Sequence, residues 1–226
     1  MITQYPRESL VAEPPALYPD YKSTVLRAPT RPLIGLDPTI SELSGPVYGH
    51  ESVVETDSDL TRQHAGEPLG ERIIVSGRVT DEDGRPLPNT LIEVWQANAA
   101  GRYIHVRDGH PAPIDPNFSG AGRCVTDVEG RYTFTSVKPG AYPWKNHHNA
   151  WRPAHIHFIV GAPGFEPVTT HMFVANDPYL DSDAVFGVKD SLVVPFVEID
   201  DSARAQELGL HNPFYIAEHE FILVNH

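Results

Sequence analysis

From residue 71 onward, the sequence alternates short runs of β-branched and aromatic residues with glycine- and proline-containing turns. Runs of this kind are typical of β-strands, and the turn residues between them favour reversal of the chain. Candidate elements are strands over residues 71–79, 89–97, 154–162, 167–175, 191–199 and 218–225, a hairpin over 124–137, and one helix over 201–210. We therefore predict a mainly β fold in the form of an antiparallel β-sandwich.

Two long loops interrupt the strands, and an arm precedes them. Residues 101–123 and 138–153 are rich in glycine, proline and polar residues, and we expect these loops to carry the active site. Residues 1–70 are rich in proline and show little helical periodicity. We expect an extended N-terminal arm over residues 1–70 and a β-sandwich catalytic domain over residues 71–226.

The net charge and the cysteine content indicate which partners are excluded and in which cellular compartment the protein is expected. The formal net charge is −13 and no cluster of lysine and arginine is present, which argues against nucleic acid as a partner. The sequence has no run of about 18 apolar residues, so we expect no membrane-spanning helix. The N-terminus does not have the pattern of a secretory signal. The single cysteine, Cys124, excludes an intrachain disulfide and is interpreted as a small core residue. These features predict a cytoplasmic protein.

The stretch WRPAHIHF, residues 151–158, places two histidines two positions apart in an apolar run. Alternate residues of a strand point to the same face, so His155 and His157 should project together while Ile156 and Phe158 enter the core. Two imidazoles on one face can bind a single metal ion. The alternative is a pair of exposed histidines on the polar face of a strand.

Each long loop also carries a tyrosine, Tyr103 and Tyr142. Tyrosine is a poor metal ligand because its pKa is about 10, but a bound cation of high charge can deprotonate a ligand. Two phenolates and two imidazoles would form an anionic set that favours ferric over ferrous iron. The alternative is that both tyrosines anchor their loops through hydrogen bonds to the backbone.

These residues lie within longer motifs that resemble one enzyme family. The motifs are GERIIVSGRVTDEDGRPLPNTLIEVWQANAAGRY, DPNFSGAGRCVTDVEGRYTFTSVKPGAYPWKN and WRPAHIHF, preceded in the arm by DYKSTVLRAPTRPLI. Together they resemble the intradiol ring-cleavage dioxygenases, most closely the β subunits of the protocatechuate 3,4-dioxygenases. The resemblance covers roughly residues 18–160.

The resemblance implies a non-haem Fe(III) held by Tyr103, Tyr142, His155 and His157. It also implies that Tyr142 leaves the metal when a catechol-type diol chelates it, and that the released phenolate serves as a base. Arg152 would stabilise negative charge on the substrate. Pro143 and Trp144 would shape the substrate pocket. The reaction would consume O2 and give a muconate-type dicarboxylate.

After residue 160 the sequence is more similar to the hydroxyquinol and catechol 1,2-dioxygenases, notably in DSDAVFGVK. His171 stands where the β subunits have a glutamine, and it is either a substrate-pocket residue or an ordinary strand histidine. Asp181 and Asp183 in the same region are interpreted as turn caps.

The resemblance makes protocatechuate the leading substrate. It also implies an oligomer, with an α-type chain as the candidate partner. Hydroxyquinol or catechol is the alternative substrate. A non-catalytic β-sandwich binding module is the alternative of another class.

Overall fold

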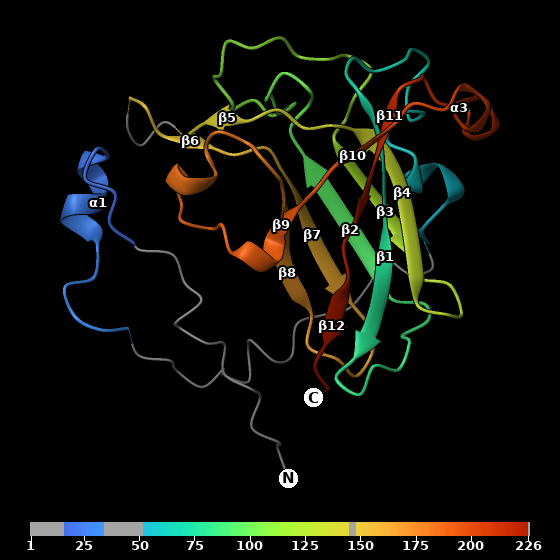
Figure 1. Cartoon of the computed structure of the whole chain (residues 1–226), viewed down its shortest axis with the longest axis horizontal. Helices are drawn as coiled ribbons and strands as arrows, with labels where there is room; N and C mark the ends of the chain where they lie inside the picture. Colours follow the sequence, from blue (N-terminus) through green and yellow to red (C-terminus); the bar gives the residue numbers. More distant parts are fainter. Residues whose placement is uncertain (1–15, 34–51, 145–147, 226) are drawn as a thin grey trace.

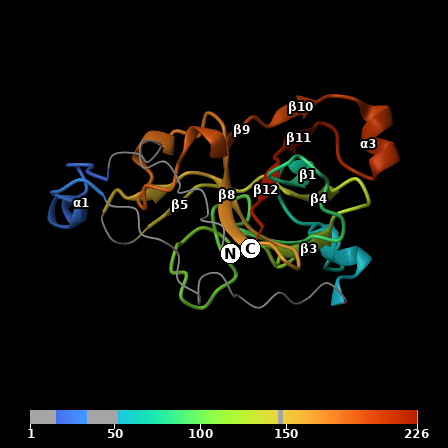
Figure 2. The same ribbon diagram turned by 90° about the horizontal axis from the view of Figure 1, so that it is seen from below.

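The computed structural model describes residues 16–33, 52–144 and 148–225. Its body is a sandwich of two β-sheets, and helices α1 (Lys22–Arg27) and α3 (Ser202–Leu208) lie at opposite ends of the long axis (Figures 1 and 2). Within these ranges, three short 3-10 helices complete the helical elements: Glu55–Ser58, Leu180–Ser182 and Asp190–Leu192. Among the described residues, no helix has the length and apolar character needed to cross a membrane.

The first sheet is built around the long strand β1 (Arg72–Asp81). β1 pairs antiparallel with β4 (Arg131–Val137) on one side. On the other side it pairs in parallel first with β11 (Phe214–Glu218) and then with β12 (Phe221–Leu223). β10 (Val197–Ile199) pairs antiparallel with β11 and forms the edge.

The second sheet has the order β3-β2-β7-β8-β9. β3 (Ala121–Val125), β2 (Leu91–Gln96), β7 (His155–Gly161) and β8 (Val168–Val174) are antiparallel neighbours. The two-residue strand β9 (Val193–Val194) runs parallel to β8. β7 and β8 correspond to the strands predicted over 154–162 and 167–175, and their pairing places two histidine-bearing strands side by side.

Aromatic rings from both sheets fill the space between them. Phe158 of β7 packs with ring centroids 5.9 Å from Phe134 of β4 and 5.1 Å from Phe221 of β12. All three are buried, together with Ile73 and Ile92 from the facing sheets. This apolar layer fixes which face of β7 is turned away from solvent, and therefore where its histidines lie.

The β-sandwich prediction is confirmed, with differences in how the strands pair. The sheets are mixed, because the C-terminal strands β11 and β12 run in the same direction as β1. The hairpin predicted over 124–137 is wrong: β3 pairs with β2, and β4 pairs with β1. Asp127 accepts hydrogen bonds from the amides of Glu129 and Arg131, so the turn forms as predicted. The turn residues specify that the chain reverses its direction, whereas burial of apolar side chains determines which sheet each of the two strands joins.

Two other predicted strands are divided. The segment 191–199 contains Pro195, which cannot donate a ladder hydrogen bond, and the chain passes there from β9 in the second sheet to β10 in the first. The segment predicted over 218–225 contains β12 and only the last residue of β11; the rest of β11, from Phe214, lies outside the predicted strand. The predicted helix forms as α3, with Asp201 accepting from the amide of Arg204 at 3.0 Å.

Much of the predicted arm lies outside the described residues, namely 1–15 and 34–51. The described part includes α1, and Tyr21 at its start is buried with Ala150 and Ala184. The hydroxyl of Tyr21 donates a hydrogen bond to the carbonyl of Ser182 at 2.9 Å. The N-terminal segment is therefore packed against the loop that follows β8, as both ribbon views show (Figures 1 and 2). The domain boundary at residue 70 stays a prediction.

Cys124 lies on β3 within the apolar core, as predicted. Burial raises the pKa of its thiol to about 12, and the thiolate is the reactive form. We expect iodoacetamide to leave Cys124 unmodified in the folded protein at mildly alkaline pH and to modify it completely in guanidinium chloride. Mass spectrometry of both samples measures this. Labelling of the folded protein at the rate of a small free thiol would contradict the burial.

Candidate metal centre

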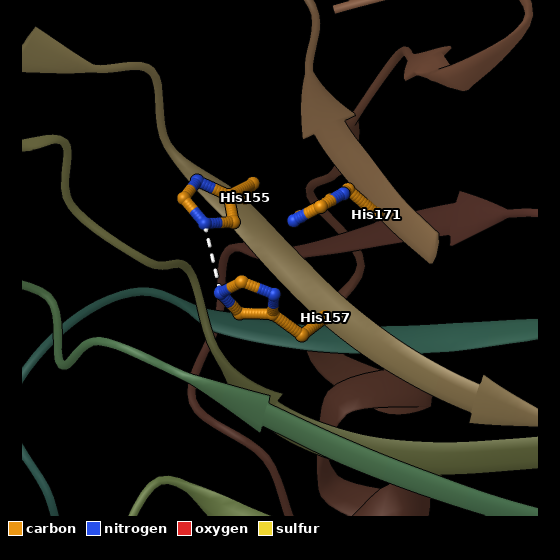
Figure 3. A group of neighbouring side chains, drawn as sticks. All are labelled: His155, His157 and His171. Atoms are coloured by element: carbon orange, nitrogen blue, oxygen red, sulfur yellow. Dashed lines mark hydrogen bonds between the residues drawn. The ribbon is translucent and has the colours of Figure 1, made fainter. Parts of the chain in front are cut away.

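Three histidines from adjacent strands converge at one end of the second sheet (Figure 3). His155 and His157 project from β7, and His171 stands opposite His157 in the register of β8. Their candidate ligand nitrogens all lie within 4.8 Å of one another. The intervening Ile156 and the following Phe158 are fully buried on the other face. The alternation that the sequence predicts for this strand is therefore confirmed.

The two histidines of β7 are held in defined orientations. The Nδ1–H of His155 donates to the carbonyl of Pro153 at 2.6 Å, which leaves the Nε2 lone pair directed at the cluster. That Nε2 lies 3.0 Å from Nε2 of His157. The His157 ring stacks on Trp95 of β2, with centroids 4.5 Å apart and an interplanar angle of 2°. Both rings therefore present Nε2 to the same point.

Burial also fixes the charge state of the cluster. Burial, followed by the neighbouring His171 and Arg152, lowers the pKa of His157 to about 3. Burial and then Arg152 lower the pKa of His171 to about 4, and the pKa of His155 is well below its usual range for the same reasons. Three neutral imidazoles at neutral pH offer the lone pairs that a metal ion requires.

The two loop tyrosines lie beside the histidines. The ring of Tyr142 is 5.5 Å from that of His155 and 5.2 Å, edge to face, from that of Tyr103. The phenol oxygen of Tyr103 is buried and has no hydrogen-bond partner within the described ranges. Burial, and then the adjacent Tyr142, raise the pKa of Tyr103 above its ordinary value. An unpaired buried hydroxyl is costly, and a metal ion bound between these groups would satisfy it.

Backbone hydrogen bonds position each tyrosine. The amide of Tyr103 donates to Asp108 at 2.9 Å, and the other oxygen of Asp108 accepts from the amide of His110 at 2.8 Å, which closes this part of the loop. Tyr142 lies on the short strand β5 (Tyr142–Pro143), which pairs with β6 (Trp151–Arg152). Tyr142 thus lies opposite Arg152, and Arg152 precedes the first residue of β7 by three positions.

Arg152 is buried and directs one guanidinium nitrogen at the histidines. Its Nη1 lies 3.2 Å from Nε2 of His155. Its Nε and Nη2 donate to the two carboxylate oxygens of Asp183 at 3.0 and 3.3 Å. The structure therefore brings together the five predicted residues Tyr103, Tyr142, Arg152, His155 and His157, with His171 beside them.

Two of the predicted pocket residues, Pro143 and Trp144, directly follow Tyr142 in the chain. Pro143 pairs with Trp151, and Trp144 is more than a third exposed. Trp144 lines a cleft of about 330 Å³ with Phe186 from the loop after β8 and with Thr24 and Arg27 from α1. Trp144 therefore belongs to a wall between the N-terminal segment and the loop that carries Asp183.

The sequence and the fold were compared with known proteins. A family model described as Dioxygenase matches residues 43–217, which is most of the chain. The chain belongs to the intradiol ring-cleaving dioxygenases. A second model, described as the N-terminal part of the protocatechuate 3,4-dioxygenase β subunit, matches residues 5–39 of this dioxygenase.

Individual relatives of the dioxygenase are named for activities on three different diols. It is 51% identical to a protocatechuate 3,4-dioxygenase β chain of Burkholderia cepacia, over 88% of this chain and 87% of that one. It is 43% identical to a hydroxyquinol 1,2-dioxygenase of Rhizobium sp. (strain MTP-10005), over 68% of this chain and 55% of the relative. The solved catechol 1,2-dioxygenase of Acinetobacter sp. ADP1 superposes with a TM-score of 0.64 at 29% identity, over 74% and 56% of the two chains. The dioxygenase thus spans just over half the length of the latter two proteins.

Two residues of the dioxygenase site were not predicted as functional. Asp183 was expected to cap a turn, which it does by accepting from the amide of Gly187 at 2.8 Å, but it also forms the ion pair with Arg152. Trp95 was expected only as a strand residue, and it is the ring on which His157 stacks. Its alternation with Glu93 along β2 was visible in the sequence, but its position opposite His157 depends on the β2–β7 register.

Proposed function

We propose that this chain opens the ring of a catechol-type diol with O2 at a non-haem Fe(III) held by Tyr103, Tyr142, His155 and His157. The observation that carries the proposal is the convergence of two phenols and two neutral imidazoles, with the Tyr103 hydroxyl buried and unpaired. Phenolates are hard anionic ligands and suit a trivalent ion better than a divalent one.

When bound, ferric iron supplies a Lewis acid that draws electron density from the diol and orients it. The residues of the chain supply the remaining functions. The phenolate oxygen of Tyr142 accepts a proton from an incoming diol hydroxyl, which must be lost before the diol can chelate. The guanidinium of Arg152, at 3.2 Å from His155, stabilises negative charge on the bound ring. The hydrogen bond from His155 to Pro153 keeps that imidazole in its ligand orientation.

Protocatechuate is the proposed substrate, and an α-type chain is the proposed partner in an oligomer. The similarity to a protein named as a protocatechuate 3,4-dioxygenase β chain supports both. The β-chain relative is matched along most of its length, unlike the relatives that act on neutral diols.

Hydroxyquinol is the second candidate substrate, and a specific observation favours it. The hydroxyquinol 1,2-dioxygenase relative is 43% identical, and His171 adds a third imidazole to the cluster. A neutral imidazole can accept or donate a hydrogen bond, so it can contact a third ring hydroxyl. Catechol is tested alongside it.

The test is oxygen uptake by the iron-loaded protein with protocatechuate, hydroxyquinol and catechol, without and with a co-expressed α-type chain. Iron content by elemental analysis is measured on the same sample. The proposal expects one iron per chain and the highest kcat/KM with protocatechuate. Iron-free protein after growth with iron, or iron-loaded protein without oxygen uptake on any diol in either form, would overturn it.

Replacing Tyr142 by phenylalanine tests the phenolate assignment directly. A tyrosinate bound to ferric iron absorbs visible light, so the wild-type protein is expected to be red-brown. Tyr142→Phe should lose part of this absorption and lower kcat by about a hundredfold or more, because a positioned base contributes about 10²–10⁴-fold. The matched control is Tyr179→Phe, a tyrosine that stacks on Trp151 outside the cluster. Unchanged colour in Tyr142→Phe would contradict the assignment.

A further inference from the structure

The ion pair between Arg152 and Asp183 is the most deeply buried charged pair within the described residues. The two side chains are 5% and 1% exposed. The carboxylate binds two edges of the guanidinium, at Nε and at Nη2. Because a guanidinium is planar, fixing two of its nitrogens sets the direction of the third. That third nitrogen is Nη1, which lies 3.2 Å from Nε2 of His155.

Asp183 is itself held by the backbone of its loop. Its Oδ2 accepts from the amide of Gly187 at 2.8 Å, and its Oδ1 lies 3.4 Å from the amide of Val185. A Cβ added at Gly187 would lie 3.2 Å from both Nη2 of Arg152 and Oδ2 of Asp183, so the backbone closes tightly over the pair. The carboxylate is thus bound on one side by the loop and on the other by the guanidinium.

Two hydrogen bonds join the same loop to neighbouring segments of the chain. The amide of Ala184 donates to the carbonyl of Trp151 at 3.0 Å, which ties the loop to β6 next to Arg152. On its outer side, the Tyr21 hydroxyl donates to the carbonyl of Ser182. Asp183 therefore sits between two backbone anchors, and its position has little freedom.

We propose that Asp183 is a positioning residue for ring cleavage, which acts by orienting the Arg152 guanidinium toward the site formed by His155 and His157. This inference rests on the proposed function. Among the described residues, no hydrogen bond joins Asp183 to the histidines or to the tyrosines, so its positioning effect passes through Arg152. Asp183, the last residue of the DSD motif at 181–183, therefore contributes to the site and does not only stabilise a turn.

The proposal is tested by a double-mutant cycle on oxygen uptake with the preferred diol. Asp183→Asn and Arg152→Leu are each expected to lower kcat about a hundredfold, since a displacement of about 1 Å can cost that much. The double variant should be no slower than Arg152→Leu, because Asp183 has no further role once Arg152 is gone. Iron content should remain at the wild-type level in Asp183→Asn. Asp181→Asn, on an exposed residue of the same loop, is the matched control and should keep wild-type kcat.

A second variant covers the case in which Asp183→Asn does not fold. Asp183→Glu keeps the charge but moves the carboxylate. The longer side chain must fit under the closely packed backbone, so the variant should fold with an unfolding temperature lowered by several degrees, while kcat falls about tenfold. Losses that multiply in the double variant would overturn the proposal, as would wild-type kcat in either folded Asp183 variant.

A measurement without activity separates this inference from the proposed function. In the iron-free protein, the Nε–H of Arg152 should exchange with solvent slowly, and at least about tenfold faster in Asp183→Asn, because its acceptor is weakened. Slow exchange in both proteins would contradict the orientation of Arg152 by Asp183, even if the enzyme were active. If the wild type takes up no oxygen, the exchange comparison still tests whether Asp183 orients Arg152.

Discussion

The His157→Ala variant is expected to bind iron more than about a hundredfold more weakly than the wild type and to lose oxygen uptake in proportion. Loss of an outer hydrogen-bond partner of a metal ligand costs about 10–100-fold in affinity or activity, and loss of the ligand itself costs more. Nε2 of His157 lies 3.0 Å from that of His155, so its removal takes away one of the two imidazoles that β7 contributes to the cluster.

The fold itself should survive this substitution. His157 is only partly buried, and its neighbours Ile156 and Phe158 keep their places in the core. The lost contact is the stacking on Trp95, and aromatic pairs of this kind contribute about 0.5–1.5 kcal/mol beyond their buried area. We therefore expect a small fall in unfolding temperature for the iron-free protein, together with a large loss of iron.

Iron content, visible absorption and oxygen uptake measure the result. The control is His211→Ala, which removes an exposed histidine paired with Glu67 and should leave all three unchanged. If His157→Ala kept one iron per chain with wild-type absorption, the ligand assignment would be wrong. Equal losses in both variants would point to a general effect of removing a histidine.

The strand alternation in WRPAHIHF could be predicted because it depends on local geometry. A period of two places Ile156 and Phe158 on one face and His155 and His157 on the other, whatever the strand pairs with. The register that brings His171 opposite His157 could not be predicted from composition, since it depends on the length of the β7–β8 turn.

Long-range partners account for what the sequence did not predict. Asp183 lies in a segment typical of a turn, and its pairing with Arg152 arises only because residues 31 positions apart meet beside β6. The predicted 124–137 hairpin was wrong for a similar reason: the turn residues Asp127 and Gly130 are compatible with strands in one sheet or in two facing sheets. Local chemistry left that choice open, and burial of the core decided it.

The Phe158→Ala variant should have the largest effect on stability. Phe158 is fully buried and its ring packs against Phe134 and Phe221 of the opposite sheet. Truncation of a buried phenylalanine costs about 3–5 kcal/mol through lost transfer energy and the cavity that remains. A domain of this size has a free energy of unfolding of about 5–15 kcal/mol, so the loss is a large fraction of it.

Urea denaturation at low temperature, with the iron-free wild type as reference, measures this change. We expect the free energy of unfolding to fall by about 3–5 kcal/mol and the unfolding temperature by about 10 °C, since 1 kcal/mol shifts a chain of this length by about 2–4 °C. Val128→Ala, at a side chain that is 77% exposed, should change the free energy by less than about 0.5 kcal/mol.

The two variants at neighbouring positions of β7 are expected to separate stability from metal binding. Phe158→Ala should still bind iron at temperatures where it is folded, because its side chain lies on the face opposite the histidines. His157→Ala should fold and lose iron. If Phe158→Ala cost less than about 1 kcal/mol, or if folded Phe158→Ala bound no iron, the division of β7 into a core face and a metal-binding face would be wrong.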